Sequence, residues 1–348
     1  MLSSKYVKRF LKAILFVAIF IVLTLILDAV LEYDESGTAH MPSEYSKQDN
    51  IETIFVGTSS GIIMDAEEYT ELTGEKAYNM CSAAQSFNVS LDNIKLAASQ
   101  HPIKKVVMFF LYDSVNDENT AIQDHIYDRV VMSTEKPTEH IRDYIGNNVE
   151  KSFNPDIIAT EESINLWIPW TNEASTDKEL IKGNIKRRFD NLIHGYSPRK
   201  EMKRDLSEVI YETNPGIPTE NDKAILANDL NNAHVLDIPD GMLNDEKLDS
   251  IDKICIFCRE NNIKLIVIAT PHRTDYFERY DSFRHYSELL DGYIDDFVSK
   301  RGLIYYNSEE EQNLHELFPD SKFMDLEHID FDYTDEATEF LTGIIRKF

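Results

Sequence analysis

The sequence predicts an α/β protein built on a three-layer, doubly wound parallel sheet, preceded by one membrane-spanning helix. Apolar runs typical of strands alternate with segments whose apolar residues recur at helical spacing. Residues 105–112 and 263–269 are apolar on both faces, as expected of parallel strands that helices cover on both sides. Residues 10–31 are apolar almost without interruption. In such sheets the functional groups gather at the carboxyl ends of the strands.

The elements follow in order from apolar content and spacing. The strands are expected at residues 51–57, 76–80, 105–112, 263–269 and 303–306. The helices are expected at residues 65–72, 87–99, 245–261, 286–300 and 334–347. Gly74 closes the first helix, because glycine readily takes the left-handed conformation that ends helices. Val89, Leu91 and Ile94 give the second helix its apolar face.

Residues 115–244 interrupt this alternation and predict a mostly helical insertion, or cap. Both tryptophans and the one long basic stretch, residues 182–204, lie in it. Basic side chains outside a membrane can bind anionic polymer or lipid headgroups, and tryptophan can lie at an interface or stack on a sugar ring. The candidate binding residues are Trp167, Trp170, Arg187, Arg188, Lys200 and Lys203. The alternative is an ordinary solvated helix face, salt-bridged to the acidic remainder.

The apolar segment 10–31 is long enough to cross a bilayer, which takes about 20 residues. Basic residues gather at its start and acidic ones at its end, namely Lys5, Lys8, Arg9 and Lys12, then Asp28, Glu32, Asp34 and Glu35. This charge bias predicts a cytoplasmic N-terminus and an extracellular main domain at the cell membrane. We therefore expect a signal-anchor at 1–32, a polar tether at 33–50 and one domain at 51–348. A cleaved signal peptide is the alternative for the first segment.

The net charge of −27 excludes nucleic acid as a partner, since binding a polyanion needs a basic surface. Cys255 and Cys258 form a C-x-x-C pair inside a helical pattern, which favours two buried core thiols over a redox site. No second cysteine pair completes a zinc site. We therefore expect neither a metal nor an organic cofactor.

Two short segments far apart in the chain have the residues of one catalytic site. The strand 51–57 runs into Gly57-Thr58-Ser59, a turn that presents a hydroxyl, and Asp325 precedes His328 by three residues ahead of the last helix. Histidine can take the serine proton while aspartate fixes the imidazole tautomer. Each motif alone also fits an ordinary capped turn or a solvated acidic loop. Together, at the first strand and before the last helix, they predict nucleophilic acyl chemistry.

A third segment, residues 77–86, is a strand that runs into a turn of small side chains. Small residues let backbone N–H groups approach a developing oxyanion. The oxyanion-hole candidates are Ser60, Ala83, Ala84 and Asn116. A plain turn with Ser86 as helix N-cap, and a loop asparagine at Asn116, are the alternatives.

These motifs together resemble the SGNH (GDSL-like) hydrolase superfamily. The resemblance lies in 56–60, in Tyr78-Asn79 with the turn that ends in Gln85-Ser86, and in Phe323-x-Asp325-x-x-His328. Within the superfamily the chain is similar to membrane-anchored bacterial proteins of surface-polysaccharide or teichoic-acid acylation systems. The D-alanine transfer protein of lipoteichoic-acid D-alanylation belongs to that group. The resemblance covers about 51–112 and 245–348.

The resemblance implies a flavodoxin-like SGNH fold and a catalytic triad of Ser59 as nucleophile, His328 as base and Asp325 as its partner. It further implies a serine esterase or O-acyltransferase that acts on acyl esters of a cell-surface glycan or teichoic acid, with a membrane-bound O-acyltransferase as a possible partner protein. The chain departs from the family pattern at Thr58, at Ser60 and in the small-residue turn. These departures support the alternative of a catalytically inactive accessory or scaffold subunit of such a system.

Overall fold

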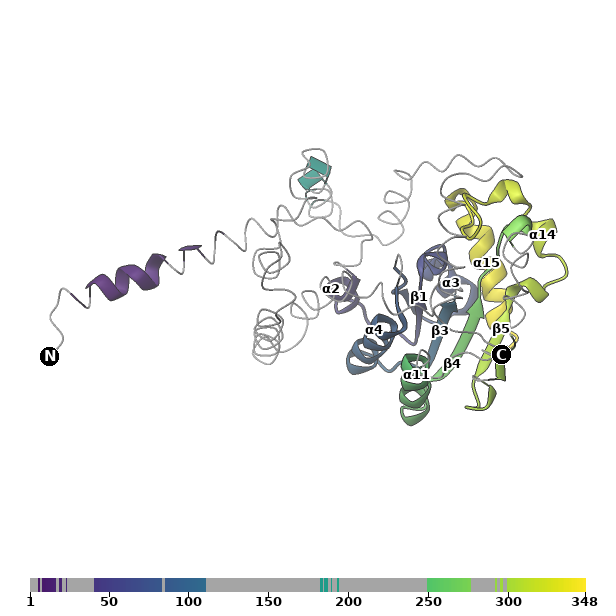
Figure 1. Cartoon of the computed structure of the whole chain (residues 1–348), viewed down its shortest axis with the longest axis horizontal. Coiled ribbons are helices and arrows are strands. Elements are labelled where there is room, and N and C mark those ends of the chain that lie inside the picture. Colours follow the sequence, from purple (N-terminus) through teal and green to yellow (C-terminus); the bar gives the residue numbers. More distant parts are fainter. Residues whose placement is uncertain are drawn as a thin grey trace, which may run out of the picture. The chain divides into compact units, whose positions relative to one another are not determined.

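The fold is built on a parallel sheet of five strands (Figure 1). A computed structural model of the chain describes residues 41–82, 85–110, 249–276 and 299–348, with separate helical residues between 6 and 23, between 182 and 193 and between 292 and 296. The strands are β1 (Thr53–Gly57), β2 (Ala77–Asn79), β3 (Lys105–Phe110), β4 (Lys264–Ala269) and β5 (Ile304–Asn307). Their order is β2-β1-β3-β4-β5, and every neighbouring pair is parallel. The predicted parallel α/β architecture is confirmed.

The chain divides into two compact units, and the sheet belongs to the unit of residues 36–134 and 199–348. The helices described in this unit are α2 (Met41–Tyr45), α3 (Ala66–Thr73), α4 (Phe87–Gln100), α11 (Asp249–Glu260), α14 (Leu314–Leu317) and α15 (Thr334–Ile345). Short 3-10 turns are η1 (Ser59–Gly61), η8 (Ser308–Glu310), η9 (Asp320–Lys322) and η10 (Phe331–Tyr333). The expected helix over 286–300 lies largely outside the described residues.

Alternate side chains of the inner strands supply two separate apolar cores. On β3, Val106 and Met108 face the core beneath α2, α4 and α11, whereas Val107 and Phe109 face the core beneath α3 and α15. Helices therefore cover both faces of the sheet, and in Figure 1 α4 and α11 lie on the opposite side from α15. This two-sided burial explains why β1, β3 and β4 have nearly continuous apolar sequences.

Capping residues set the ends of the helices that pack on the sheet. The Asp65 carboxylate caps α3 by accepting the N–H groups of Glu67 and Glu68. Gly74 ends α3 in the left-handed conformation at φ +78°, as predicted. Ser86 caps α4 by accepting the Val89 N–H. This is the helix N-cap that the sequence offered as the alternative for the turn at 77–86.

The compact unit begins before position 51, because part of the segment expected to be a tether is folded. Met41–Tyr45 forms α2, and the Tyr45 ring is fully buried. The Tyr45 hydroxyl donates to the Ala97 carbonyl of α4, and the Tyr78 hydroxyl donates to the Met41 carbonyl. A helix of five residues has no periodicity to read, so only tertiary packing defines it.

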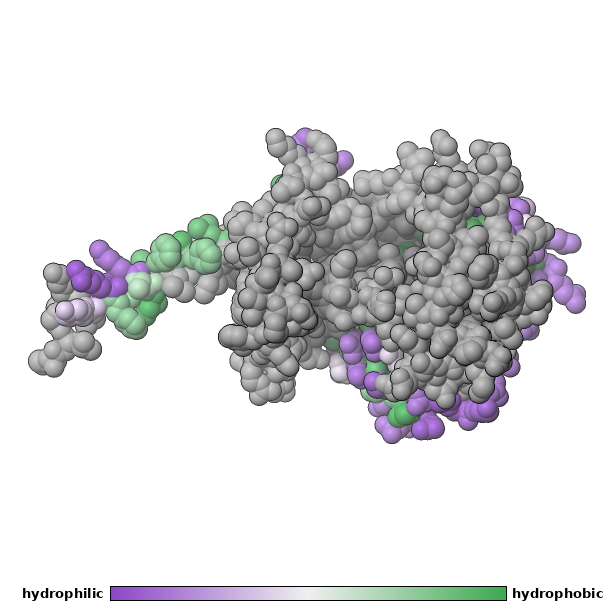
Figure 2. Space-filling view, in the orientation of Figure 1, coloured by the Kyte–Doolittle hydropathy of each residue, from purple (hydrophilic) through white to green (hydrophobic). Residues whose placement is uncertain are grey.

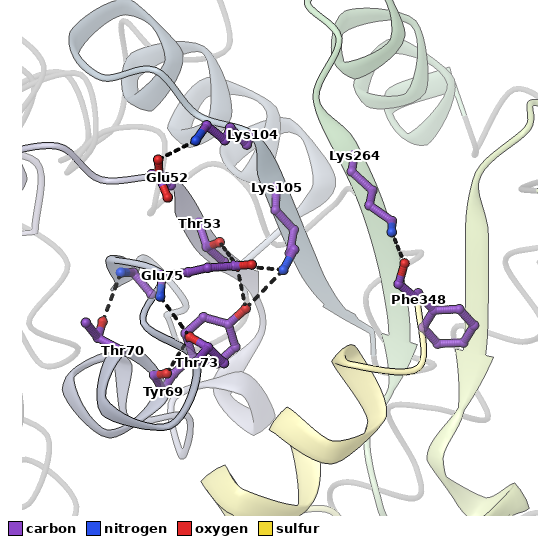
Figure 3. A network of polar contacts seen from close by, with 11 residues as sticks. Glu52, Thr53, Tyr69, Thr70, Thr73, Glu75, Lys104, Lys105, Lys264 and Phe348 are labelled. Atoms are coloured by element: carbon purple, nitrogen blue, oxygen red, sulfur yellow. Dashed lines mark hydrogen bonds and ion pairs between the residues drawn. The ribbon is translucent and has the colours of Figure 1, made fainter.

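At the amino ends of β1 and β3, a polar network ties the sheet to α3 (Figure 3). The Glu75 carboxylate accepts hydrogen bonds from Lys105 at 2.6 Å, Tyr69 at 3.1 Å and Thr53 at 3.2 Å. Burial acts to raise the pKa of Glu75, but the hydrogen bond and charge of Lys105, with the Tyr69 and Thr53 bonds, lower it below its ordinary value. The network lies at the amino edge of the strands, so we assign it to stability.

Cys255 and Cys258 are buried, reduced core residues of α11. Burial raises the pKa of each thiol to about 12, so both stay protonated at neutral pH. The interpretation as core thiols is confirmed.

The predicted anchor and insertion fall mostly outside the described residues. Of residues 10–31, the structure describes 10–16, 19, 20 and 23, whose large apolar side chains are about half exposed or more (Figure 2, green). No helix among the described residues is both long and apolar enough to span a membrane.

Candidate active site

Ser59 lies on a tight turn directly after the carboxyl end of β1. Gly57 ends that strand at φ +128°, and a Cβ there would lie 2.2 Å from the Phe109 carbonyl oxygen of β3. Only glycine is compatible with this position, since any other residue would have a strained backbone and a Cβ that clashes with β3. The chain then turns through η1, where the N–H groups of Gly61 and Ile62 donate to the carbonyls of Thr58 and Ser59. The Ser59 side chain is left half-buried at the carboxyl edge of the sheet.

His328 is presented by a closed loop ahead of α15. Phe323 and Ile329 form an antiparallel bridge, and the Met324 N–H donates to the His328 carbonyl at 2.8 Å. The Arg273 N–H, just after β4, donates to the Leu326 carbonyl at 2.9 Å. The loop is therefore held where its two ends pair, at Phe323 and Ile329, and at Leu326 in its middle.

The two segments meet in the folded chain, as predicted. Ser59 Oγ lies 2.7 Å from His328 Nε2 across 269 positions of sequence. His328 Nδ1 lies 2.8 and 2.9 Å from the two carboxylate oxygens of Asp325. Nucleophile, imidazole and carboxylate thus form one continuous hydrogen-bonded chain, with the geometry that general-base activation of a serine requires.

Burial increases along the hydrogen-bonded series from the Ser59 hydroxyl to the Asp325 carboxylate. The Asp325 side chain is 1% exposed and the His328 side chain 18%. Burial acts to raise the pKa of Asp325, but the charge and hydrogen bond of His328 and the backbone N–H groups of Glu327 and His328 outweigh it. The pKa of Asp325 lies below its ordinary value, so the carboxylate is ionised at neutral pH and can hold Nδ1–H.

A hydrogen bond also joins the start of α3 to α15. The Asp65 N–H, at the start of α3, donates to Thr338 Oγ1 of α15 at 2.9 Å, and Thr338 is fully buried. Because α3 follows the Ser59 turn and α15 follows the His328 loop after η10, this bond links the segments that carry the two halves of the site.

The loop after β2 runs beside the Ser59 turn. The Met80 N–H donates to the Phe55 carbonyl, and the Ser82 N–H donates to the Gly57 carbonyl at 3.1 Å. The Cys81 N–H donates to the Asn79 side-chain oxygen at 2.9 Å. The N–H groups of Cys81 and Ser82 are therefore both hydrogen-bonded within the protein.

Candidate oxyanion donors remain at the start of η1. The first N–H groups of a helix have no partner within it, and no acceptor within the described part of the chain is found for the N–H groups of Ser59 and Ser60. Ser60 is buried, and its Oγ lies 3.2 Å from Thr58 Oγ1, so its side chain packs inward. Ala83, Ala84 and Asn116, the other predicted donors, lie outside the described residues.

Sequence reasoning missed a buried polar group at the carboxyl end of β4. His272 is buried and stacks on Tyr276, and its backbone N–H donates to the Glu309 carboxylate at 2.7 Å. Arg273 is fully buried and pairs with Asp275 at 2.6 Å. Their position immediately after a central strand was the available signal, because that is where parallel sheets carry functional groups.

The predicted polymer- or membrane-binding residues are not placed by the structure. Trp167, Trp170, Arg187, Arg188, Lys200 and Lys203 lie outside the described residues. Within the part of the chain that is described, no three His, Cys, Asp or Glu side chains converge in a way that could hold a metal ion.

Comparison of the chain with profiles of known families and with curated protein sequences finds no match. A half-buried serine hydroxyl bonded to an imidazole, which a buried carboxylate orients, is an arrangement suited to forming and resolving a covalent acyl-serine.

Proposed function

We propose that the chain is a serine esterase or O-acyltransferase of the SGNH type, acting through an acyl intermediate on Ser59. The observation that carries the proposal is the 2.7 Å contact between Ser59 Oγ and His328 Nε2, backed by the buried Asp325. An inactive scaffold has no need to keep this contact. The strand order β2-β1-β3-β4-β5 is that of flavodoxin-like folds, which agrees with the proposed class.

In the first half of the reaction, Ser59 Oγ attacks the carbonyl carbon of an acyl ester as His328 Nε2 takes its proton. The carbonyl oxygen becomes an oxyanion within reach of backbone N–H groups at the start of η1. The tetrahedral intermediate then collapses, and the C–O bond to the departing alcohol breaks. His328 returns the proton to that alcohol, and the acyl group stays on Ser59.

In the second half, His328 takes a proton from an acceptor hydroxyl, which attacks the acyl-serine carbonyl. The Ser59 ester bond breaks, and Ser59 regains its proton from His328. The acceptor is water in an esterase and a glycan hydroxyl in a transferase. Asp325 stays ionised throughout and stabilises the imidazolium.

For the cellular setting, we propose that residues 10–31 anchor the chain in the cell membrane and that the domain acts outside, on a glycan or teichoic acid. The basic segment 182–204 supports an anionic polymer as substrate, and a membrane-bound O-acyltransferase is the proposed partner that supplies the acyl group.

A fluorophosphonate probe on the full-length protein in detergent tests the proposal. We expect labelling of the wild type, none of Ser59→Ala, and retained labelling of Ser60→Ala, whose serine is adjacent but buried. Labelling that persists in Ser59→Ala removes Ser59 from the mechanism. A folded wild type that never reacts favours the accessory-subunit alternative.

A further inference from the structure

Asn79, the last residue of β2, bonds to the segment that follows Ser59 and to the loop after β2. Its side-chain nitrogen donates to the Gly61 carbonyl at 2.9 Å and to the Met64 carbonyl at 2.8 Å. Its side-chain oxygen accepts the Cys81 N–H at 2.9 Å. One amide therefore bridges the turn that carries Ser59 and the loop that runs beside it.

These bonds hold the end of the short turn that begins at Ser59 and the residues that follow it. The 3-10 turn that begins at Ser59 is only three residues long, and helices that short are not stable without tertiary contacts. Gly61 packs so closely that a Cβ there would lie 2.5 Å from the Phe109 ring and 2.6 Å from Cys81 Sγ. A small displacement of this turn would move Ser59 Oγ away from His328.

The chemistry at this position requires an amide. Two bonds go to carbonyl oxygens and need donors, while the third comes from an N–H and needs an acceptor. Asparagine supplies both kinds of group on one short side chain. Aspartate has the same shape but offers only acceptors when ionised, so its carboxylate would face two carbonyl oxygens.

We propose that Asn79 is a positioning residue for the nucleophile, which holds the Ser59 turn in register with the loop after β2. This inference rests on the proposed serine chemistry. Asn79 does not touch the reacting atoms. It fixes the direction of Ser59 Oγ and of the N–H groups at the start of η1, and catalysis is sensitive to misplacement of such groups by about 1 Å.

The test compares Asn79→Asp with Asn261→Asp in the full-length protein in detergent. Asn261 is a matched control, because its side-chain nitrogen donates to one backbone carbonyl, that of Phe257, at an exposed site just after the end of α11. The readouts are the rate of fluorophosphonate labelling, kcat and KM on a small chromogenic ester, the unfolding midpoint, and amide hydrogen exchange over residues 58–64. Asn79→Ser, which removes the amide without adding charge, replaces Asn79→Asp if the latter does not fold.

For Asn79→Asp we expect labelling and kcat to fall about 100-fold, with KM and the pH midpoint of the rate unchanged. Exchange over 58–64 should become faster, and Asn261→Asp should match the wild type in all readouts. Labelling within threefold of the wild type, or unchanged exchange over 58–64, overturns the inference. If the wild type itself does not react, the proposed function fails, and hydrogen exchange alone then decides whether Asn79 holds the turn.

Discussion

The Asp325→Asn variant should keep the fold of the His328 loop while disabling the imidazole as a base. In the wild type, Asp325 Oδ1 accepts the N–H groups of Glu327 and His328 at 2.8 and 2.9 Å, and both carboxylate oxygens lie within 2.9 Å of His328 Nδ1. An asparagine that keeps its carbonyl oxygen on the backbone N–H groups turns its NH₂ toward Nδ1. Nδ1 must then accept a hydrogen bond from that NH₂ group, which places the ring proton on Nε2. A protonated Nε2 faces Ser59 and cannot take the serine proton.

The magnitude follows from the loss of the correct tautomer. In a serine triad this substitution lowers kcat by about 10⁴-fold, which corresponds to about 5.5 kcal/mol of barrier at about 1.4 kcal/mol per tenfold. The free energy of unfolding should fall by only about 1 to 3 kcal/mol, since the backbone bonds can persist. Because the pKa of Asp325 is lowered in the folded protein, this stability difference is fully present above about pH 4 and disappears as the pH falls below it.

The assay is turnover of a chromogenic acyl ester, with urea unfolding of the same samples. Asp330→Asn is the matched control, because Asp330 lies just past the bridge that closes the loop, and its carboxylate caps η10 by accepting the Asp332 N–H. We expect Asp330→Asn to retain wild-type kcat. A folded Asp325→Asn protein within tenfold of the wild type would refute the assigned role of the carboxylate.

Three further outcomes are expected. Ester turnover should fall as the pH drops through about 6 to 7, where an ordinary imidazole gains a proton, and a flat rate from pH 5 to 8 in folded protein would exclude His328 as the base. Gly57→Ala should lower the free energy of unfolding in urea by about 2 to 4 kcal/mol, whereas Gly343→Ala, which has open space around it, should raise it by up to about 1 kcal/mol; equal effects would contradict the close approach to β3. Glu75→Gln should cost less than about 1 kcal/mol, since the carboxylate is partly exposed, and should leave kcat unchanged; a large loss of kcat would show that the bond to Lys105 supports the site.

Much of the fold was predictable because local chemistry and tertiary structure agree in it. After the lysine that begins each strand, β3 and β4 are apolar without alternation, and the structure buries both of their faces. Gly74 and Ser86 end and begin helices where their residue types predict. The meeting of Ser59 with His328 was predictable from topology, since both follow elements that deliver residues to one edge of a parallel sheet.

The features that were missed depend on contacts that leave no pattern in the sequence. Helix α2 is defined by Tyr45 packing against α4, not by spacing of its own residues. Asn79 belongs to the Tyr78-Asn79 motif noted in the sequence. Its role was not predictable, because its side chain donates to backbone carbonyls, which every residue type has. The bond from the Cys81 N–H to the Asn79 side chain likewise depends on how the loop after β2 folds, which residue types alone do not predict.

The most direct test of the serine mechanism is to locate the acyl group during turnover. Full-length protein is mixed with a chromogenic acyl ester, quenched in acid and digested with trypsin, and the peptide of residues 48–76 is analysed by mass spectrometry. The mechanism predicts one acyl group on Ser59 of this peptide, absent in Ser59→Ala and retained in Ser60→Ala. An acyl group on another residue, or turnover by the Ser59→Ala protein at the wild-type rate, would contradict it.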